Sequence, residues 1–264
     1  MDLGGKRVLI TGASRGIGEA MARSFAEAGA TVALVARSAD ALQALADGLG
    51  GTAHAADLAD PAQVDALIGR VEDEAGPVDV LVNNAGIEST AGFADAPDGE
   101  LQRVTQVNYL TPAELCRRAT PRMLSRGGGH IVNISSLAAI SVFPGLVSYG
   151  ASKAALSAFT SGLRVDLRGL PIGVTLVELG PVPTDLLAKA DDYWPTRDSF
   201  RRMYRLHMLA DVPREKVAAA VVEAVRKGRR NVRHPRRAAM FSGLVETPRR
   251  ITALALSGVA HQPR

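Results

Sequence analysis

Three polar residues in the middle of the chain have types and spacing suited to chemistry. Tyr149 and Lys153 are four positions apart, so on a helix their side chains share one face. An ammonium group beside a phenol favours the phenolate and lowers the pKa of the phenol. Ser136 ends the apolar run His130–Ser136, which is typical of a buried strand. The three side chains could hold a carbonyl oxygen and give it a proton, provided that a hydride donor binds beside them.

The rest of the chain alternates apolar strands with helical segments. Such alternation predicts βαβ units, and hence a doubly wound α/β domain with a parallel sheet of about seven strands and helices on both faces. No repeat or low-complexity linker interrupts it, so we expect a single catalytic domain over residues 1–234. The expected strands are Lys6–Thr11, Thr31–Ala36, Thr52–Ala56, Val78–Val82, His130–Ser136, Ile172–Glu178 and Asn231–His234.

Helix boundaries follow from capping residues and prolines. Ser38 is expected to cap the second helix. Asp60 precedes Pro61 at the start of the third, where a proline fits the first turn. A long helix is expected over Asp98–Ser125, with Pro112 and Pro121 bending or breaking it.

Composition limits the class of protein. The 264 residues are 47% hydrophobic and 22% charged, which suits a sizeable core and excludes a disordered chain. A lone cysteine, Cys116, rules out an internal disulfide, and the five histidines are scattered, so we expect no metal site. The chain begins without a charged and then apolar leader, and no apolar run is long enough to span a membrane. We therefore expect a cytoplasmic protein.

Positive charge is concentrated near the C-terminus. Residues 235–264 are expected to form a basic amphipathic extension that either prolongs a subunit contact or touches a membrane surface weakly. A solvated helix end is the simplest interpretation; an acidic partner, anionic lipid or a phosphate-bearing substrate are the alternatives. Motifs for reading nucleic acid are absent, so no nucleic-acid partner is expected. The basic residues are Arg226, Lys227, Arg229, Arg230, Arg233, Arg236, Arg237, Arg249 and Arg250.

A glycine-rich turn joins the first strand to the first helix. Gly12, Gly16 and Gly18 would let the backbone turn tightly and approach a pyrophosphate at the helix N-terminus. Plain turn glycines would look the same in isolation, but the position after the first strand of a βαβ unit favours a dinucleotide site.

The end of the second strand distinguishes the two dinucleotides. An acidic residue there would bind the ribose 2′-hydroxyl of NAD. This chain has Ala36-Arg37-Ser38 instead, and Arg37 with Arg15 could hold a 2′-phosphate through forked hydrogen bonds. Two surface arginines are the alternative. The pattern favours NADP(H).

Taken together, the motifs resemble the short-chain dehydrogenase/reductase family. The resemblance extends from Lys6 to about Lys227 and implies a Rossmann-type fold and an NADP(H)-dependent oxidoreductase that interconverts a carbonyl and an alcohol. The residues that carry it, in order, are Thr11-Gly12-Ala13-x-x-x-Gly16-x-Gly18, Asp57, Asn83-Asn84-Ala85-Gly86, Asn108, Ser136 and Tyr149-x-x-x-Lys153.

The resemblance also implies a role for each catalytic residue. Tyr149 would be the general acid in reduction and the base in oxidation. Lys153 would lower the pKa of Tyr149 and contact the nicotinamide ribose. Ser136 would hydrogen-bond the substrate oxygen, and Asn108 would hold a water that links Lys153 to solvent.

The implied cofactor contacts follow the strand ends. Asp57 would bind the adenine amino group, with Leu58 beside it. Asn83, Ala85 and Gly86 would border the adenosine ribose and brace the central strands, and Val182 and Thr184 would hold the carboxamide. The full expected set is Gly12, Ser14, Arg15, Gly16, Ile17, Gly18, Arg37, Ser38, Asp57, Leu58, Asn84, Ala85, Gly86, Tyr149, Lys153, Gly180, Val182 and Thr184.

The chain after the sixth strand carries one departure from the family and the expected substrate lid. Leu179 precedes Gly180 where the family usually has proline, and Pro181 follows one place later. The expected lid over residues 184–212 is apolar, aromatic and basic, which favours a lipophilic carbonyl or alcohol, with or without an acidic group. The apolar, aromatic and basic residues that give the lid this character are Tyr193, Trp194, Arg197, Phe200, Arg201, Arg202, Met203, Tyr204, Arg205 and Met208.

Several functional alternatives stay open. The enzyme could be a 3-oxoacyl thioester reductase of fatty-acid metabolism, or the chain could be a non-catalytic dinucleotide-binding regulator, although such proteins usually lack the tyrosine or the lysine. The resemblance implies pairing of the helices Asp98–Ser125 and Tyr149–Arg168 between subunits, giving a homodimer or homotetramer.

Overall fold

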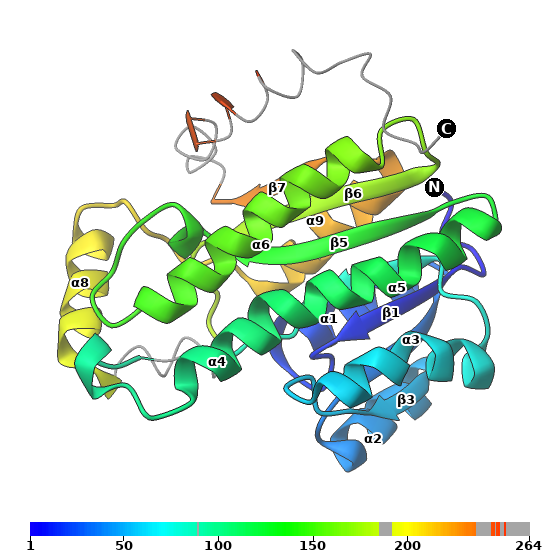
Figure 1. Cartoon of the computed structure of the whole chain (residues 1–264), viewed down its shortest axis with the longest axis horizontal. Coiled ribbons are helices and arrows are strands. Elements are labelled where there is room, and N and C mark those ends of the chain that lie inside the picture. The colour runs from blue at the N-terminus through cyan, green and yellow to red at the C-terminus, as the bar shows by residue number, and fades with distance from the viewer. Residues whose placement is uncertain (89, 185–191, 236–243, 246, 249–250, 252–264) are drawn as a thin grey trace.

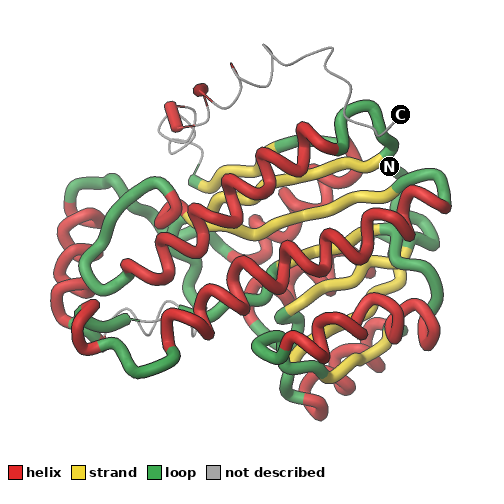
Figure 2. Tube along the Cα trace, viewed as in Figure 1, coloured by secondary structure: helices red, strands yellow, loops and turns green. Residues whose placement is uncertain are grey.

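The computed structural model describes residues 1–88, 90–184, 192–235, 244–245, 247–248 and 251. Its core is one sheet of seven parallel strands in the order β3-β2-β1-β4-β5-β6-β7 (Figures 1 and 2). The predicted α/β fold is therefore confirmed, and the bounds of every predicted strand differ from the observed bounds by at most two residues. The strands are β1 (Arg7–Thr11), β2 (Thr31–Ala36), β3 (Thr52–Ala55), β4 (Val80–Asn83), β5 (Gly129–Ser136), β6 (Ile172–Leu179) and β7 (Asn231–His234).

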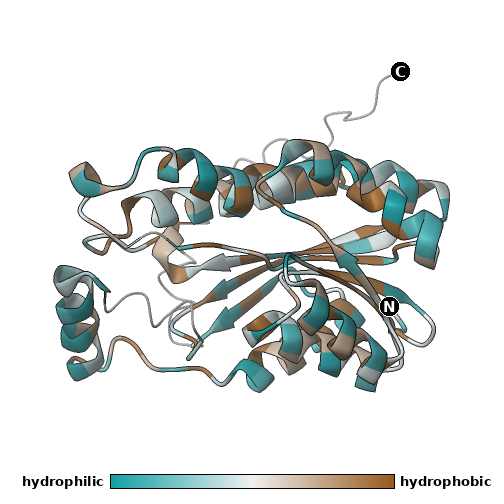
Figure 3. Ribbon diagram, turned by 90° about the horizontal axis from the view of Figure 1, so that it is seen from below, coloured by the Kyte–Doolittle hydropathy of each residue, from teal (hydrophilic) through white to brown (hydrophobic). Residues whose placement is uncertain are grey.

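Helices cover both faces of the sheet (Figure 3). Alternate strand residues pack in opposite directions: Val8 and Ile10 join the hydrophobic cluster of one face, and Leu9 joins that of the other. The first face is covered by α1 (Gly16–Glu27), α2 (Ala39–Leu49) and α9 (Arg214–Lys227). The second is covered by α3 (Pro61–Ala75), α5 (Thr111–Ser125) and α6 (Val147–Asp166).

Two of the predicted helix starts differ in how they are capped. Asp60 accepts a hydrogen bond from the backbone N–H of Ala62 at 2.9 Å, with Pro61 in the first turn of α3, as predicted. Ser38 occupies the N-cap position of α2, but its side chain makes no capping hydrogen bond. Its hydroxyl is thus not committed to the helix, and Ser38 lies in the lining of the main cavity.

The predicted long helix continues through both prolines. It consists of α4 (Glu100–Thr105), a π-helical turn over Gln106–Leu110, and α5. Pro112 lies in the first turn of α5, and Pro121 lies inside α5, which continues to Ser125. Pro121 and Arg117 are both exposed, so water can hydrate the Arg117 carbonyl that loses its hydrogen bond. A break at Pro121 was therefore a wrong prediction.

A buried polar cluster joins the middle of the sheet to two helices. The Asn83 side-chain amide donates to Oδ1 of Asn133 at 2.8 Å and to the sulfur of Cys116 at 3.3 Å. Asn133 donates in turn to the hydroxyl of Thr160 on α6 at 2.9 Å. Burial raises the pKa of the Cys116 thiol to about 12, so this cysteine is a packing residue and not a reactive thiolate.

The parts of the chain beyond the sheet are described incompletely. Residues 185–191 of the predicted lid and most of the predicted basic extension, residues 235–264, lie outside the described residues. α8 (Trp194–Arg205) is the described helix of the lid region. Within the described ranges no helix has both the length and the apolar character to cross a membrane, and no three His, Cys, Asp or Glu side chains are grouped to bind a metal.

Candidate active site

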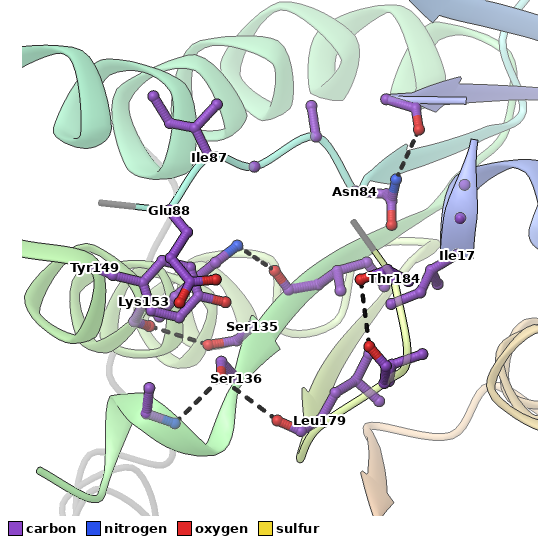
Figure 4. Close-up of a pocket in the computed structure, with 18 of the residues that line it drawn as sticks. Ile17, Asn84, Ile87, Glu88, Ser135, Ser136, Tyr149, Lys153, Leu179 and Thr184 are labelled. Carbon is purple, nitrogen blue, oxygen red and sulfur yellow. Dashed lines mark hydrogen bonds between the residues drawn. The ribbon is translucent and has the colours of Figure 1, made fainter. Parts of the chain in front are cut away.

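A cavity of about 1180 Å³ opens at the carboxyl ends of β1, β4, β5 and β6 (Figure 4). In the sheet, β1 lies between β2 and β4, so the strands that follow β1 in the chain are added first on one side of it and then on the other. Ligands of doubly wound folds bind at the carboxyl ends of the strands where this direction reverses. All the predicted cofactor residues line the cavity, as do Ser136, Tyr149 and Lys153. Asn108 and Asn83 do not.

The glycine-rich turn forms a cradle that only glycine backbone can make. Gly12 has φ of 67°, and a Cβ there would lie 2.8 Å from the Cα of Ala85. A Cβ on Gly18 would lie 2.1 Å from the carbonyl oxygen of Gly12. The side chain of Arg15, the N-cap residue of α1, makes no capping hydrogen bond, so it leaves the first N–H groups of the helix available. The cradle therefore fits a pyrophosphate group.

The adenosine end of the cavity has the predicted composition. Arg37 and Ser38 follow β2, Asp57 and Leu58 follow β3, and all four line the cavity with Arg15. Asp57 accepts a hydrogen bond from the N–H of Ala59 at 3.0 Å. This bond keeps its short turn in place beside the cavity.

The two asparagines after β4 have separate tasks. The Asn84 amide donates to the carbonyls of Thr11 at 2.9 Å and Gly12 at 3.2 Å, so it holds β4 against the glycine-rich turn. Asn83 points away from the cavity and bonds to Asn133. The predicted bracing role of Asn83 agrees with these contacts, but its predicted place beside the ribose is wrong, because successive residues of a strand face opposite ways.

Ser136, Tyr149 and Lys153 come together at the end of β5 and the start of α6 (Figure 4). The Ser136 and Tyr149 side chains both line the cavity. Ser136 also donates to the Leu179 carbonyl at 3.4 Å and accepts from the Ala138 N–H at 3.1 Å. The Lys153 ammonium donates to the Ile134 carbonyl at 3.0 Å and lies 5.8 Å from the centre of the Tyr149 ring.

Burial shifts both titratable members of this cluster toward their neutral forms. It raises the pKa of Tyr149, and the negative charge of Glu88 adds to the rise, while the Ser136 hydrogen bond opposes it. Burial lowers the pKa of Lys153, which is 4% exposed, to about 8. In the protein alone the Tyr149 pKa thus moves opposite to the predicted direction. The reason is that Lys153 faces the ring and the Ile134 carbonyl, while desolvation acts on the phenol itself.

Asn108 is fully buried in the π-helical turn, behind the cavity wall. Its Oδ1 accepts from the N–H of Ile87 at 2.9 Å, and its amide donates to the Ile87 carbonyl at 2.9 Å and to the Ser152 hydroxyl at 3.0 Å. The side chain therefore fixes the segment after β4 against α6. Its predicted role in holding a water stays a prediction.

The substrate end of the cavity is lined by apolar residues of the predicted lid and also by apolar residues from outside it. Phe200, Met203 and Met208 line it as predicted. Tyr193, Trp194 and Tyr204 do not: Trp194 is 65% exposed, and the Tyr204 hydroxyl bonds to the Asp211 carboxylate. Lining residues that sequence reasoning missed are Ile87, Glu88, Arg103, Ile140, Phe143, Leu146, His207 and Leu209.

Leu179, the departure from the usual family pattern, leaves the neighbouring turn in place. It is buried at the end of β6, and its carbonyl accepts the Ser136 hydrogen bond. The Gly180 N–H donates to the His234 carbonyl at 2.7 Å, and the Thr184 hydroxyl donates to the Val182 carbonyl at 3.2 Å. Gly180, Val182 and Thr184 all reach the cavity.

A dinucleotide cradle and a serine, tyrosine and lysine cluster in one cavity of a doubly wound sheet define a class: oxidoreductases that use a nicotinamide dinucleotide. The family model described as short chain dehydrogenase matches residues 6–193 of this chain. The chain belongs to the short-chain dehydrogenase/reductase family.

Two of the curated relatives carry names from acyl metabolism. The ketoacyl reductase HetN of Nostoc is 41% identical over 66% of this chain, and the match spans 63% of HetN, less than two thirds of its length. The fatty acyl-CoA reductase Rv0547c of Mycobacterium tuberculosis is 39% identical over 73% of this chain and 68% of its own. These relatives place the chain among oxidoreductases.

Two similar solved structures contain different dinucleotides. A metagenomic short-chain oxidoreductase in complex with NADP is 36% identical, with a TM-score of 0.64 over 69% of this chain and 85% of its own. A short chain dehydrogenase/reductase from Burkholderia phymatum in complex with NAD is 27% identical, with a TM-score of 0.78 over 100% and 99% of the chains. The family therefore accommodates both dinucleotides, and the choice depends on local residues.

Proposed function

We propose that this protein is an NADP(H)-dependent oxidoreductase that interconverts a carbonyl and an alcohol on a lipophilic small molecule, with Tyr149 as general acid and base. The observation that carries the proposal is the meeting of Ser136, Tyr149 and Lys153 in the cavity that also contains the glycine cradle.

Ser136, Tyr149 and Lys153 each have a separate role in the reduction. A bound nicotinamide dinucleotide supplies the hydride. Ser136 and Tyr149 present their hydroxyls to the carbonyl oxygen, and Tyr149 gives that oxygen a proton. Its raised pKa keeps the phenol protonated at neutral pH, and the Lys153 cation stabilises the phenolate left behind. Such proton transfer contributes roughly 10²- to 10⁴-fold to the rate.

The preference for NADP(H) rests on charge at the adenosine end. Arg15 and Arg37 line the cavity there, and the position after β2 carries Arg37 where an NAD enzyme would have a carboxylate. Comparing kcat/KM for NADPH and NADH tests this directly, and a preference for NADH would overturn it.

The Tyr149→Phe variant tests the catalytic assignment. Loss of the hydroxyl should abolish carbonyl reduction and leave NADPH binding, followed by its fluorescence, nearly unchanged. Tyr109→Phe is the matched control, because Tyr109 lies outside the cavity lining and packs edge-on against Phe159. Full turnover in Tyr149→Phe would refute the assignment. A wild type that binds NADPH but turns over no carbonyl would favour a non-catalytic regulator.

A second candidate is a 3-oxoacyl thioester reductase, which the names of HetN and Rv0547c suggest. The apolar substrate end would suit an acyl chain, and Arg103 would meet an anionic carrier group at the edge. NADPH consumption against a panel of aldehydes, ketones, quinones, steroids and acetoacetyl thioesters separates the two, because only the second candidate confines turnover to the thioesters.

We also propose a homo-oligomer formed through α5 and α6. Exposed positions of α6 at Val147, Ala151, Ala158 and Gly162 recur at helical spacing and form a face of small apolar residues. Such a face allows a partner helix to approach closely.

A cytoplasmic location is part of the proposal, and cell fractionation of the full chain tests it.

A further inference from the structure

Lys153 is held against β5 at both ends of the residue, by two consecutive strand positions. Its side-chain ammonium group donates to the carbonyl of Ile134 at 3.0 Å. Its own backbone carbonyl accepts a hydrogen bond from the hydroxyl of Ser135 at 3.0 Å (Figure 4). Ser135 and Lys153 are both buried. The two bonds are therefore shielded from water, and each of them joins α6 to β5.

The hydroxyl of Ser135 also bonds to the hydroxyl of Ser157, one helical turn after Lys153, at 2.8 Å. A hydroxyl has one proton to donate. Ser135 gives its proton to the Lys153 carbonyl, which can only accept, so Ser157 must be the donor in the second bond. The chain of hydrogen bonds thus runs in one direction, from Ser157 through Ser135 to the Lys153 carbonyl. Buried hydrogen bonds arranged in this way polarise and strengthen one another.

The Ser135 bond fixes how far along β5 the helix α6 lies. Ile134 and Ser135 are neighbours on one strand, so a shift of α6 along β5 would lengthen both of their contacts with Lys153 at once. The same shift would move Tyr149, one turn earlier on α6, relative to Ser136 at the end of β5. A misplacement of about 1 Å between reacting groups can slow a reaction by about 10²-fold.

Two other contacts secure α6 at different levels. The Ser152 hydroxyl donates to the Tyr149 carbonyl at 2.7 Å and accepts from the Asn108 amide at 3.0 Å, which joins α6 to the π-helical turn and not to the sheet. The bond from Asn133 to Thr160 does reach the sheet, but it lies about two helical turns beyond Lys153. Ser135 therefore joins β5 to α6 at the level of the catalytic residues.

We propose that Ser135 is a positioning residue for the reduction: its hydroxyl, supported by that of Ser157, keeps the catalytic groups of α6 in register with the end of β5. The inference rests on the proposed carbonyl reductase function and adds two serines to the residues on which that chemistry depends. Ser135 lines the cavity, but its proton is given to the Lys153 carbonyl. It therefore acts through Lys153 and does not donate to the substrate oxygen.

Three serine-to-alanine variants, assayed with NADPH and the best substrate of the carbonyl panel, test the proposal. Ser135→Ala should lower kcat by about tenfold or more, because misplaced groups slow the chemical step, and should leave KM within about twofold. Ser157→Ala leaves the Ser135 bond in place and should lower kcat by about two- to fourfold. Ser161→Ala is the control and should keep the wild-type kcat, since its hydroxyl bonds within α6 to the Ser157 carbonyl at 3.0 Å.

Two further measurements separate positioning from a general loss of stability. Ser135→Thr keeps the hydroxyl and suits a strand, so kcat should return to within about threefold of the wild type. Reductive methylation of the protein without dinucleotide, followed by mass spectrometry, gives a readout that does not depend on turnover. Lys153 should be methylated about threefold faster or more in Ser135→Ala than in the wild type, while the exposed Lys216 should react equally in both.

Wild-type kcat in Ser135→Ala, an equal loss in Ser161→Ala, or a Ser135→Thr variant as slow as Ser135→Ala would each overturn the inference while leaving the reductase in place. Unchanged methylation of Lys153 in Ser135→Ala would do the same. A wild type that reduces no member of the carbonyl panel would instead refute the proposed function, and the inference with it.

Discussion

At the scale of single residues, Tyr149 and Lys153 illustrate how a site is prepared by desolvation. Burial raises the pKa of the phenol and lowers that of the ammonium group to about 8. The phenol is thus kept as an acid at neutral pH, while the lysine titrates close to the physiological range. The same burial that tunes the chemistry makes the charged lysine a cost to folding.

This cost predicts how Lys153 affects stability. Because its folded pKa of about 8 lies below the ordinary value of 10.5, the unfolded chain binds more protons between those two values, and stability rises with pH there. At pH 7 the free energy of unfolding of Lys153→Met should therefore exceed that of the wild type by about 1–3 kcal/mol. The variant should unfold at a higher urea concentration and should lose carbonyl reduction. The difference should shrink as pH rises toward 10.

Urea unfolding of both proteins at several pH values measures this, with Lys216→Met as control because Lys216 is exposed. A wild type and a Lys153→Met variant whose stabilities run parallel from pH 7 to pH 10 would contradict the prediction.

At the scale of elements, the π-helical turn Gln106–Leu110 carries Asn108, which anchors the segment after β4. Asn108→Ala leaves the N–H and carbonyl of Ile87 without their side-chain partner. The free energy of unfolding should fall by about 1–3 kcal/mol, and the KM for carbonyl substrates should rise because the segment after β4 loses its anchor. Gln102→Ala removes an exposed amide from α4 and should change stability by less than about 0.5 kcal/mol. Equal effects of the two substitutions would argue against the anchoring role.

The glycine cradle gives a second prediction at this scale. Gly18→Ala would push a Cβ to within 2.1 Å of the Gly12 carbonyl, so the turn must shift away from its pyrophosphate-binding shape. NADPH binding, measured by fluorescence titration, should weaken at least about tenfold. Gly48→Ala on α2 meets no atom within 4 Å and should raise stability by about 0.4–1 kcal/mol without affecting binding. Normal NADPH affinity in Gly18→Ala would contradict the assignment of this turn as the pyrophosphate-binding site.

Local patterns made the strands, the glycine turn and the Tyr149–Lys153 pair predictable from sequence, because each depends on residues close in the chain. Trp194 was misplaced because the rotation of α8 is set by tertiary packing. Thr196 bonds to the Pro144 carbonyl at 2.6 Å and fixes the buried face, and Trp194, two positions earlier, lies about 200° around the helix from it. The place of Glu88 depends on Asn108, twenty residues away in sequence. Its position two residues after the Asn-Asn-Ala-Gly motif was the available signal.

At the scale of the whole molecule, the face of small residues on α6 predicts the assembly. Ala158→Arg would place a long charged side chain on that face, so the protein should sediment as a monomer where the wild type sediments as a dimer or tetramer. Ala44→Arg adds the same charge to an exposed position of α2 and should leave the assembly intact. A monomeric wild type, or an unchanged Ala158→Arg oligomer, would exclude this interface.

The paired amides of Asn83 and Asn133 have a consequence for how the chain avoids misfolding. The two residues are direct register partners on β4 and β5. A shift of either strand by one residue would turn one amide toward the opposite face, leaving two buried amides unpaired at about 1–3 kcal/mol each. Apolar side chains alone would tolerate many such slipped pairings. The pair therefore penalises mispaired intermediates during folding and favours the register in which β4 and β5 end side by side at the cavity.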